Sequence, residues 1–212
     1  MATMKEIAQI CGVSRGTVDR VINRRGKVRP ETERMILQAV ERMGFAEMTE
    51  IQEKTIPVMM AGYDVIAKAP TGTGKTCAFG IPVAEHILPE NKYPQAVIMA
   101  PTRELAQQIA QELEELTYFM PEVQVACVYG GANMEKQARR LAEGCQIVVA
   151  TPGRLMDHYK HHSIDLAHVT QVVLDEADEM LNMGFYKDVR HIIEMMKARK
   201  SLSMFSATIS RE

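Results

Sequence analysis

A glycine-rich loop followed by lysine and threonine carries the strongest chemical signal in this sequence. Residues 69–76 read Ala-Pro-Thr-Gly-Thr-Gly-Lys-Thr, which fits the pattern G-x-x-x-x-G-K-[ST] once its first glycine is relaxed to alanine. Gly72 and Gly74 permit backbone angles at which several N–H groups converge on one anion. Lys75 can reach the β- and γ-phosphates of a nucleotide, and the Thr76 hydroxyl can ligate Mg²⁺. We therefore predict an ATP–Mg²⁺ site whose loop residues are Thr71, Gly72, Thr73, Gly74, Lys75 and Thr76.

The elements around this loop fit such a site. Residues 64–67, Asp-Val-Ile-Ala, predict a short buried strand, and residues 76–87 carry apolar side chains at helical spacing. The loop would then open a helix whose positive end faces the phosphates. By itself, a Gly-Lys-Thr string is also compatible with an ordinary glycine-rich turn.

An acidic cluster about one hundred residues further along favours the nucleotide interpretation. Residues 171–174 are apolar after the first, and Asp175, Glu176 and Asp178 follow. A central parallel strand delivers a carboxylate to the carboxyl edge of a sheet in this way. We expect Asp175 to hold Mg²⁺ and Glu176 to orient or deprotonate an attacking water, with Lys75 as the third catalytic residue.

With these residues, the sequence resembles the DEAD-box ATP-dependent RNA helicases over residues 44–212, the first of that family's two RecA-like domains. Phe45, Thr49 and Gln52 resemble the adenine-sensing Q motif, in which the resemblance implies that Gln52 reads the adenine edge and Phe45 stacks on the ring. The implied fold is α/β, a RecA-like P-loop domain with a mostly parallel sheet flanked by helices.

Three further strings resemble the family's RNA-contacting motifs. Each follows an apolar strand, so all should lie on the sheet edge that carries the ATP site. The resemblance implies that they hold the backbone of single-stranded RNA without reading its sequence. Their residues are Pro101, Thr102 and Arg103, then Gly130 and Gly131, then Thr151, Pro152, Gly153 and Arg154. Ser206 and Thr208 resemble the motif that couples hydrolysis to strand separation through hydroxyl hydrogen bonds to the acidic motif.

The family's second RecA-like domain is absent from this sequence. By the resemblance, that domain carries arginine fingers, whose loss costs on the order of 10³–10⁵ in the rate of phosphoryl transfer. We therefore expect weak nucleotide binding, very slow hydrolysis and no unwinding by this chain alone, with a second RecA-like lobe as a partner.

Residues 1–45 form a separate pattern, and we place the domain boundary between them and residues 46–212. Residues 4–11 predict a short helix with Ile7, Ala8 and Ile10 inward, and residues 15–22 a second helix after a tight turn. A third helix starts near residue 30 and runs to about residue 43. Two short helices joined by such a turn make a helix-turn-helix, a small all-α module.

This segment resembles the DNA-binding headpiece of the lac-repressor family from about Met4 to Phe45. Gly12-Val13-Ser14, Thr17-Val18 and Arg20-Val21-Ile22-Asn23 carry the resemblance. It implies that Arg15 and Arg20 face the bases of duplex DNA, with Arg suited to guanine. Ser14, Thr17 and Asn23 would contact phosphates. Residues 1–45 hold nine Lys and Arg against five Asp and Glu, a net of +4 in a chain of net −2, which favours a nucleic-acid contact at this end.

The two resemblances meet in the third helix. Ile36, Ala39, Val40 and Met43 form a stripe that faces the headpiece, and Met35 and Leu37 widen it. We interpret the chain as a fusion, engineered or naturally recombined, that is spliced within a helix shared by both modules. Because no Gly-, Ser- or Pro-rich linker separates the modules, we expect a stiff connection between them.

The composition excludes other classes of protein. The sequence contains no run of 18 apolar residues, so we expect no membrane-spanning helix. The four cysteines lack the paired spacing of metal ligands, which favours a reducing, cytoplasmic setting. The six histidines are expected to be solvated loop residues. Two alternatives stay open: a DNA-binding regulator of lac-repressor type with a passenger or ATP-sensing RecA lobe, and a fusion fragment that binds ATP without coupled activity.

Overall fold

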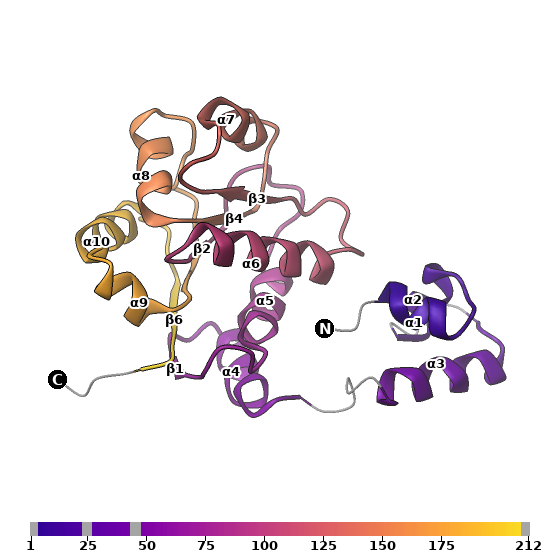
Figure 1. Cartoon of the computed structure of the whole chain (residues 1–212). Coiled ribbons are helices and arrows are strands. Elements are labelled where there is room, and N and C mark those ends of the chain that lie inside the picture. The colour runs from indigo at the N-terminus through magenta and orange to yellow at the C-terminus, as the bar shows by residue number, and fades with distance from the viewer. Residues whose placement is uncertain (1–3, 23–26, 43–47, 209–212) are drawn as a thin grey trace. The chain divides into compact units, whose positions relative to one another are not determined.

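The chain divides into two compact units, Met1–Met48 and Thr49–Glu212. The computed structural model describes residues 4–22, 27–42 and 48–208 (Figure 1). Each unit has its own buried cluster of apolar side chains, so each is described by itself.

Three helices make up the smaller unit: α1 (Met4–Ile10), α2 (Arg15–Ile22) and α3 (Pro30–Arg42). Among its side chains whose burial is described, those of Ile7, Ala8, Cys11, Val18, Val21 and Ile36 form a buried core. The prediction for Ile10 was wrong, because its side chain is 65% exposed. At about 100° per residue, the position four residues after Ile7 shares its face, so Cys11 fills that place instead.

The expected shared helix is only partly described. Met35 and Leu37 on α3, which were to widen its packing face, are 40% and 49% exposed. Residues 43–47, including Met43 and the expected stiff connection, lie outside the described part of the chain. Integration of the two modules through this helix therefore stays a prediction.

Six short apolar runs of the larger unit form one sheet. Because most of their side chains are buried on both faces, they read as continuous apolar runs, as strands of parallel sheets do. The strands are β1 (Val65–Lys68), β2 (Ala96–Met99), β3 (Val125–Val128), β4 (Ile147–Ala150), β5 (Gln171–Leu174) and β6 (Ser201–Ser206). The helices are α4 (Glu50–Met60), α5 (Lys75–Glu85), α6 (Arg103–Leu116), α7 (Met134–Ala142), α8 (Pro152–Lys160), α9 (Ala177–Asn182) and α10 (Tyr186–Met195).

The strand order is β1-β6-β5-β2-β4-β3, and every described ladder is parallel. The predicted α/β fold is therefore confirmed. Since parallel strands end at the same edge, the segments that follow all six strands gather at the carboxyl edge of the sheet. Each of the predicted chemical motifs that follows a strand is one of these segments.

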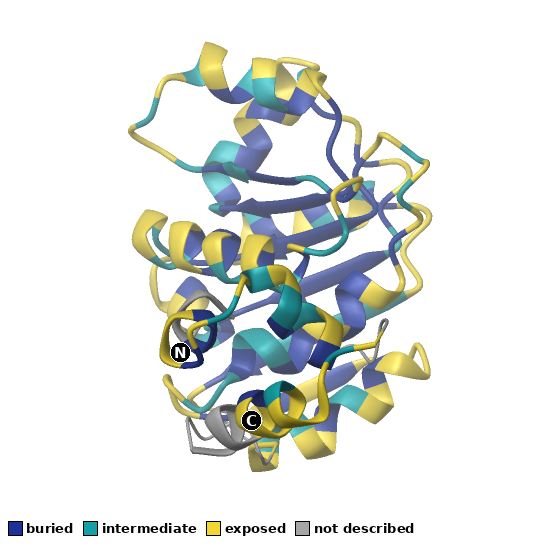
Figure 2. Cartoon of the chain, turned by 90° about the vertical axis from the view of Figure 1, so that its right-hand side faces the viewer, coloured by how far each residue is buried: buried dark blue, intermediate teal, exposed yellow. Residues whose placement is uncertain are grey.

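Alternating strand residues build two cores, one on each face of the sheet. Ile98 and Phe205 face the layer of α4, α5 and α6, where Phe79 of α5 meets Phe205 with ring centroids 5.3 Å apart. Met99 and Leu174 face the layer that includes α8, α9 and α10. Figure 2 shows the buried strands between helices whose outer faces are exposed. This three-layer packing makes the sheet edge a fixed platform for the segments that follow the strands.

One histidine departs from the expectation that all six are solvated. His158 lies on α8 and is fully buried. Its Nε2 lies 3.1 Å from Oε1 of Gln137 on α7, so it is part of the packing between two helices.

Within the described residues, no helix combines the length and the apolar character that crossing a membrane requires.

Candidate functional site

The loop after β1 has the backbone geometry of an anion site. Gly72 and Gly74 both have φ of +83°, a left-handed conformation that disfavours any residue with a Cβ. The Thr73 hydroxyl donates to the Pro70 carbonyl at 2.8 Å and closes the loop. Helix α5 begins directly after Gly74, at Lys75, so its positive end faces the space inside the loop.

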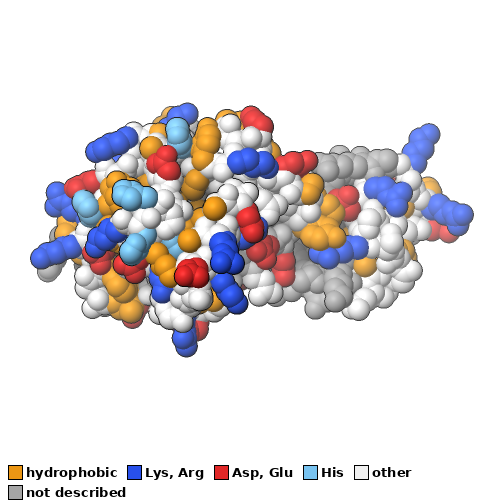
Figure 3. Space-filling view, turned by 90° about the horizontal axis from the view of Figure 1, so that it is seen from above, with side chains coloured by type: hydrophobic (Ala, Val, Ile, Leu, Met, Phe, Trp, Pro, Cys, Tyr) orange, Lys and Arg blue, Asp and Glu red, His pale blue; other side chains and the backbone are white. Residues whose placement is uncertain are grey.

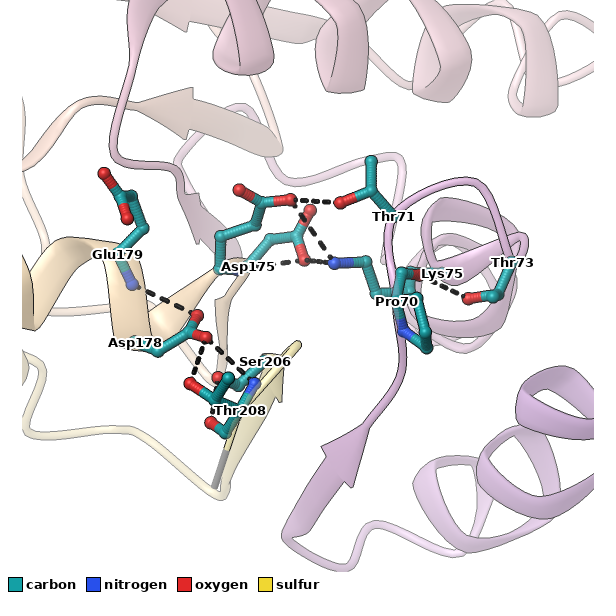
Figure 4. A network of polar contacts seen from close by, with 10 residues as sticks. Pro70, Thr71, Thr73, Lys75, Asp175, Asp178, Glu179, Ser206 and Thr208 are labelled. Carbon is teal, nitrogen blue, oxygen red and sulfur yellow. Dashed lines mark hydrogen bonds and ion pairs between the residues drawn. The ribbon is translucent and has the colours of Figure 1, made fainter. Parts of the chain in front are cut away.

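Lys75 joins this loop to the acidic segment after β5 (Figure 4). Its Nζ lies 3.3 Å from Oδ1 of Asp175 and 3.6 Å from Oε1 of Glu176. Lys75 and Asp175 are 5% and 2% exposed. Burial raises the pKa of the Asp175 carboxyl, and the positive charge of Lys75 opposes that rise. The predicted pairing of the loop with the acidic motif is therefore present at atomic distance.

Glu176 is held in a strained conformation. Its φ is +52° and its ψ is 52°, values that a non-glycine residue adopts at a cost and that cluster at functional sites. The Thr71 hydroxyl donates to its Oε1 at 2.9 Å. The sequence predicted both residues in the site but not this contact between them, because the two lie 105 residues apart.

The residues present fit a nucleotide phosphate and Mg²⁺. The ammonium group of Lys75 is buried and has no hydrogen-bond partner among the described residues, although two carboxylates lie nearby. A phosphate oxygen would supply that partner. Thr76 and Asp175 offer the hard oxygen ligands that Mg²⁺ prefers, and Mg²⁺ completes its shell with phosphates and water.

The segment expected to read adenine contacts the loop directly. The Gln52 side chain donates from Nε2 to the Gly74 carbonyl at 3.1 Å and accepts from the Thr49 backbone N–H at 3.1 Å. Beside them lies a cavity of about 330 Å³, lined by Thr49, Glu50, Ile51, Lys54, Lys68, Ala69, Pro70 and Thr73. Thr49, Ala69, Pro70 and Thr73 belong to the motifs that the sequence predicted, whereas Glu50, Lys54 and Lys68 carry no motif signal that could have identified them. Phe45 lies outside the described residues.

The segment after β6 is tied to the acidic segment through Asp178. Thr208 donates to Oδ2 of Asp178 from its hydroxyl at 2.6 Å and from its backbone N–H at 2.9 Å. The Ser206 hydroxyl donates to the Thr208 carbonyl at 2.6 Å. Burial acts to raise the pKa of Asp178, but hydrogen bonding by Thr208 and Ser206 outweighs it and lowers the pKa to about 2. The link expected between these two segments runs through this carboxylate.

Replacing Thr208 with valine is expected to raise the pKa of Asp178 towards its ordinary value of about 4, because the ionised form loses its shortest hydrogen bond. A carboxyl with a lowered folded pKa stabilises the fold above its unfolded pKa. That contribution is lost as the pH falls from about 4 to about 2. A carboxyl NMR titration measures the shift.

Thr117→Val is the matched control, because the Thr117 hydroxyl donates to a backbone carbonyl, that of Leu113, rather than to a carboxylate. It should leave the Asp178 titration unchanged. An Asp178 pKa that stays near 2 in Thr208→Val would contradict the assigned hydrogen bond.

The segments after β2 and β3 lie next to each other. Pro101 is buried, and the Thr102 side chain caps α6 by accepting from the Leu105 N–H at 3.3 Å. Arg103 is exposed and bonds the neighbouring Glu104. A Cβ added to Gly131 would lie 3.8 Å from an Arg103 nitrogen. Exposed Gly130 and Gly131 thus lie beside the Arg103 guanidinium. This agrees with the prediction that the segments after β2 and β3 meet at the same edge of the sheet.

The segment after β4 contacts the same loop. Thr151 precedes α8, with Pro152 in its first turn, and Thr151 and Gly153 are half-buried. The Arg154 side chain is only 12% exposed. Its Nη1 donates to the Ala132 carbonyl at 3.0 Å and to Gln137 Oε1 at 2.9 Å. The three predicted segments therefore form one continuous surface, with Arg154 largely beneath it.

The smaller unit presents its own polar residues at the start of α2. The Ser14 Oγ accepts from the Thr17 N–H at 3.2 Å and lies 2.9 Å from the Thr17 hydroxyl, so it caps this helix. Arg20 is exposed and its Nε donates to the Gly16 carbonyl at 3.0 Å, whereas Arg15 is half-buried. Asn23 lies outside the described residues. Lys and Arg side chains are prominent on the visible face of this unit, while charges of both signs mix on the larger one (Figure 3).

Comparison with known protein families gives two matches that follow the division into two units. Residues 49–212 match the family described as DEAD/DEAH box helicase. Residues 3–47 match the bacterial regulatory proteins of the lacI family. Both resemblances expected from the sequence are therefore confirmed.

Individual relatives agree with the larger match. The chain is 50% identical over 174 residues to the ATP-dependent RNA helicase CshA of Listeria monocytogenes, a match that covers 82% of this chain and 33% of that protein. It is 44% identical over 174 residues to the ATP-dependent RNA helicase DeaD of Escherichia coli, covering 82% of this chain and 28% of that protein. The chain thus spans about a third of the length of these relatives.

Solved structures agree as well. A hypothetical ATP-dependent RNA helicase from Sulfolobus tokodaii superposes with a TM-score of 0.73 at 42% identity, covering 82% of this chain and 50% of that one. A DEAD box protein from Methanococcus jannaschii gives a TM-score of 0.73 at 42% identity, covering 82% and 48%. The likeness extends from sequence to fold.

Proposed function

Because this chain belongs to the DEAD/DEAH box helicase family, we propose that residues 49–212 are an ATP–Mg²⁺-binding lobe that also contacts the backbone of single-stranded RNA. The observation that carries the nucleotide part is the buried ammonium group of Lys75. It lies 3.3 and 3.6 Å from the Asp175 and Glu176 carboxylates, and it lies at the mouth of a loop with two left-handed glycines. A phosphate at this position would accept further charge-assisted hydrogen bonds from it.

The residues of the acidic segment have distinct roles in this proposal. Mg²⁺, held through Thr76 and Asp175, supplies charge neutralisation for the phosphates. Lys75 binds the β- and γ-phosphates and, in the absence of nucleotide, balances the two carboxylates that lie within 3.6 Å of it. Glu176 positions a water for attack in line with the γ-phosphate and accepts its proton. The Thr71 hydroxyl occupies one acceptor position of this carboxylate, and the remaining positions can hold the water.

The RNA part rests on the adjacency of three segments. Arg103, the Gly130–Gly131 pair and the start of α8 lie on one edge, where exposed backbone and one exposed guanidinium are available. Contacts of this kind bind phosphates and sugars and carry no sequence information. We further propose that a second RecA-like lobe completes the ATP cleft, and that this chain alone hydrolyses ATP slowly and does not unwind RNA. Cytoplasmic localisation stays a prediction.

Fluorescence anisotropy with a single-stranded RNA oligomer, with and without a non-hydrolysable ATP analogue and Mg²⁺, tests this proposal. Arg103→Ala is expected to weaken RNA binding and to reduce the dependence of log K on log salt by about one unit, the effect of losing one phosphate contact.

Arg199→Ala is the matched control. It removes the same charge from an exposed position just before β6, at the amino edge of the sheet, and should leave RNA binding unchanged. Equal effects of the two substitutions would contradict the assignment of this edge.

A second candidate function is DNA binding by residues 3–47, which the lacI-family match favours. The capped start of α2 and exposed Arg20 support it, but a single headpiece would bind largely through phosphates and with high salt sensitivity. Duplex DNA in the same anisotropy assay separates the candidates. Binding to duplex that exceeds binding to RNA, and that falls in Arg20→Ala, would favour the DNA-binding regulator.

A further inference from the structure

Gln137 on α7 is a buried polar residue that no motif of the sequence singled out. Its side chain is 8% exposed and lies beneath the surface formed by the segments after β3 and β4. Its Nε2 donates to the Tyr129 carbonyl at 3.1 Å. Its Oε1 accepts from Nη1 of Arg154 at 2.9 Å and lies 3.1 Å from Nε2 of His158. One amide group therefore ties α7 to two other elements, the segment after β3 and α8.

These contacts fix both ends of the Gly130–Gly131 pair. The residue before the pair is held by Gln137 through the Tyr129 carbonyl. The residue after it is held by Arg154, whose Nη1 also donates to the Ala132 carbonyl at 3.0 Å. The two exposed glycines thus lie between two carbonyls that one buried cluster keeps in place.

The chemistry of the cluster requires an amide at this position. A carboxylate has no donor for the Tyr129 carbonyl, and an aliphatic side chain has neither donor nor acceptor. His158 can donate to Oε1 only when its Nε2 carries a proton. Its Nδ1 has no hydrogen-bond partner among the described residues, and burial followed by the charge of Arg154 lowers its pKa. A neutral histidine with a protonated Nε2 therefore fits the cluster.

We infer that Gln137 is a positioning residue for RNA binding, whose amide fixes the Gly130–Gly131 pair through Tyr129 and Arg154. This inference rests on the proposed contact between that edge and RNA. Gln137 lies under the protein surface, so it would act on the bound RNA only through the Gly130–Gly131 pair. Arg154, which the sequence placed in direct contact with RNA, has its Nη1 engaged in the same support.

The test is Gln137→Leu, which keeps the approximate volume and removes all three contacts. Since the Tyr129 carbonyl and His158 Nε2 lose their partner and Arg154 Nη1 keeps only the Ala132 carbonyl, RNA affinity should fall on the order of tenfold, while the affinity for the ATP analogue stays unchanged. The amide NMR resonances of Gly130 and Gly131 should shift in the protein without RNA, because the loop loses its support at Tyr129 directly and at Ala132 through the loosened Arg154.

Gln146→Leu is the matched control. Gln146 is also fully buried, and it bonds three backbone groups, the carbonyls of Pro89 and Glu122 and the N–H of Gln124. It precedes β4 at the amino edge of the sheet, so its loss destabilises the fold without reaching the proposed RNA edge. If Gln137→Leu does not fold, Gln137→Asn keeps the amide but shortens its reach by one carbon, and the same shifts and loss are expected.

Three results decide between the possibilities. Shifted Gly130 and Gly131 resonances with weaker RNA binding in the Gln137 variant, and neither effect in Gln146→Leu, support the inference. Unshifted resonances, unchanged RNA affinity, or an equal loss in Gln146→Leu would overturn it. Failure of the unaltered protein to bind RNA would instead overturn the proposed function, whatever the resonances do.

Discussion

Lys75→Ala is expected to abolish measurable binding of Mg²⁺–ATP, with an affinity loss on the order of 100-fold or more. Hydrogen bonds from a charged group to phosphate are worth about 1.5–3 kcal/mol each, and the Lys75 ammonium group is buried where water cannot replace it. The substitution also leaves Asp175 buried without its nearest cation, so the folded state should lose stability as well. Calorimetric titration with the ATP analogue measures the first effect and thermal unfolding the second.

Lys187→Ala is the control, because Lys187 is exposed on α10 and has no part in the proposed site. It should bind nucleotide like the unaltered chain. Unchanged affinity in a folded Lys75→Ala protein would refute the assigned phosphate site.

Gly74→Ala should also lose most of its nucleotide affinity. Its φ of +83° costs any residue with a Cβ about 1–2 kcal/mol. In addition, the new Cβ would lie 2.4 Å from Nε2 of Gln52, which itself bonds the Gly74 carbonyl. The Gln52 side chain would have to swing away and lose its hydrogen bond to the Gly74 carbonyl, so both the nucleotide affinity and the free energy of unfolding should fall.

Gly62→Ala is the control that separates the backbone strain of a positive φ from the steric contact with Gln52. Gly62 has a similar φ of +80°, but a Cβ there meets nothing within 4 Å. It should lose stability by the strain alone and keep its nucleotide affinity. A Gly74→Ala protein that resembles Gly62→Ala in both measurements would show that the contact with Gln52 does not hold the loop.

Much of the site could be predicted because the motifs follow strands. Apolar runs such as Val172–Leu174 identify buried strands, and parallel pairing then brings their ends to one edge without further information. Lys75 and Asp175 could therefore be paired from sequence, and the ion pair at 3.3 Å agrees.

What could not be predicted depends on contacts between distant positions. Gln137 and His158 are polar residues of types that usually lie at the surface, and only the packing of α7 against α8 buries them. The Thr71–Glu176 hydrogen bond depends on the height of two loops above the sheet. Ile10 was misplaced because a helix of seven residues has too few turns for its apolar face to be read reliably.

The central claim is that the loop after β1 and the carboxylate after β5 form one metal–nucleotide site. Mn²⁺ can replace Mg²⁺ together with the ATP analogue, and its paramagnetism broadens the NMR signals of nearby nuclei. The amide signals of Thr76, Asp175 and Glu176 should broaden more strongly than those of β3, and the effect should vanish in Lys75→Ala. Sharp signals at Thr76 and Asp175, with broadening confined to other parts of the chain, would contradict the site.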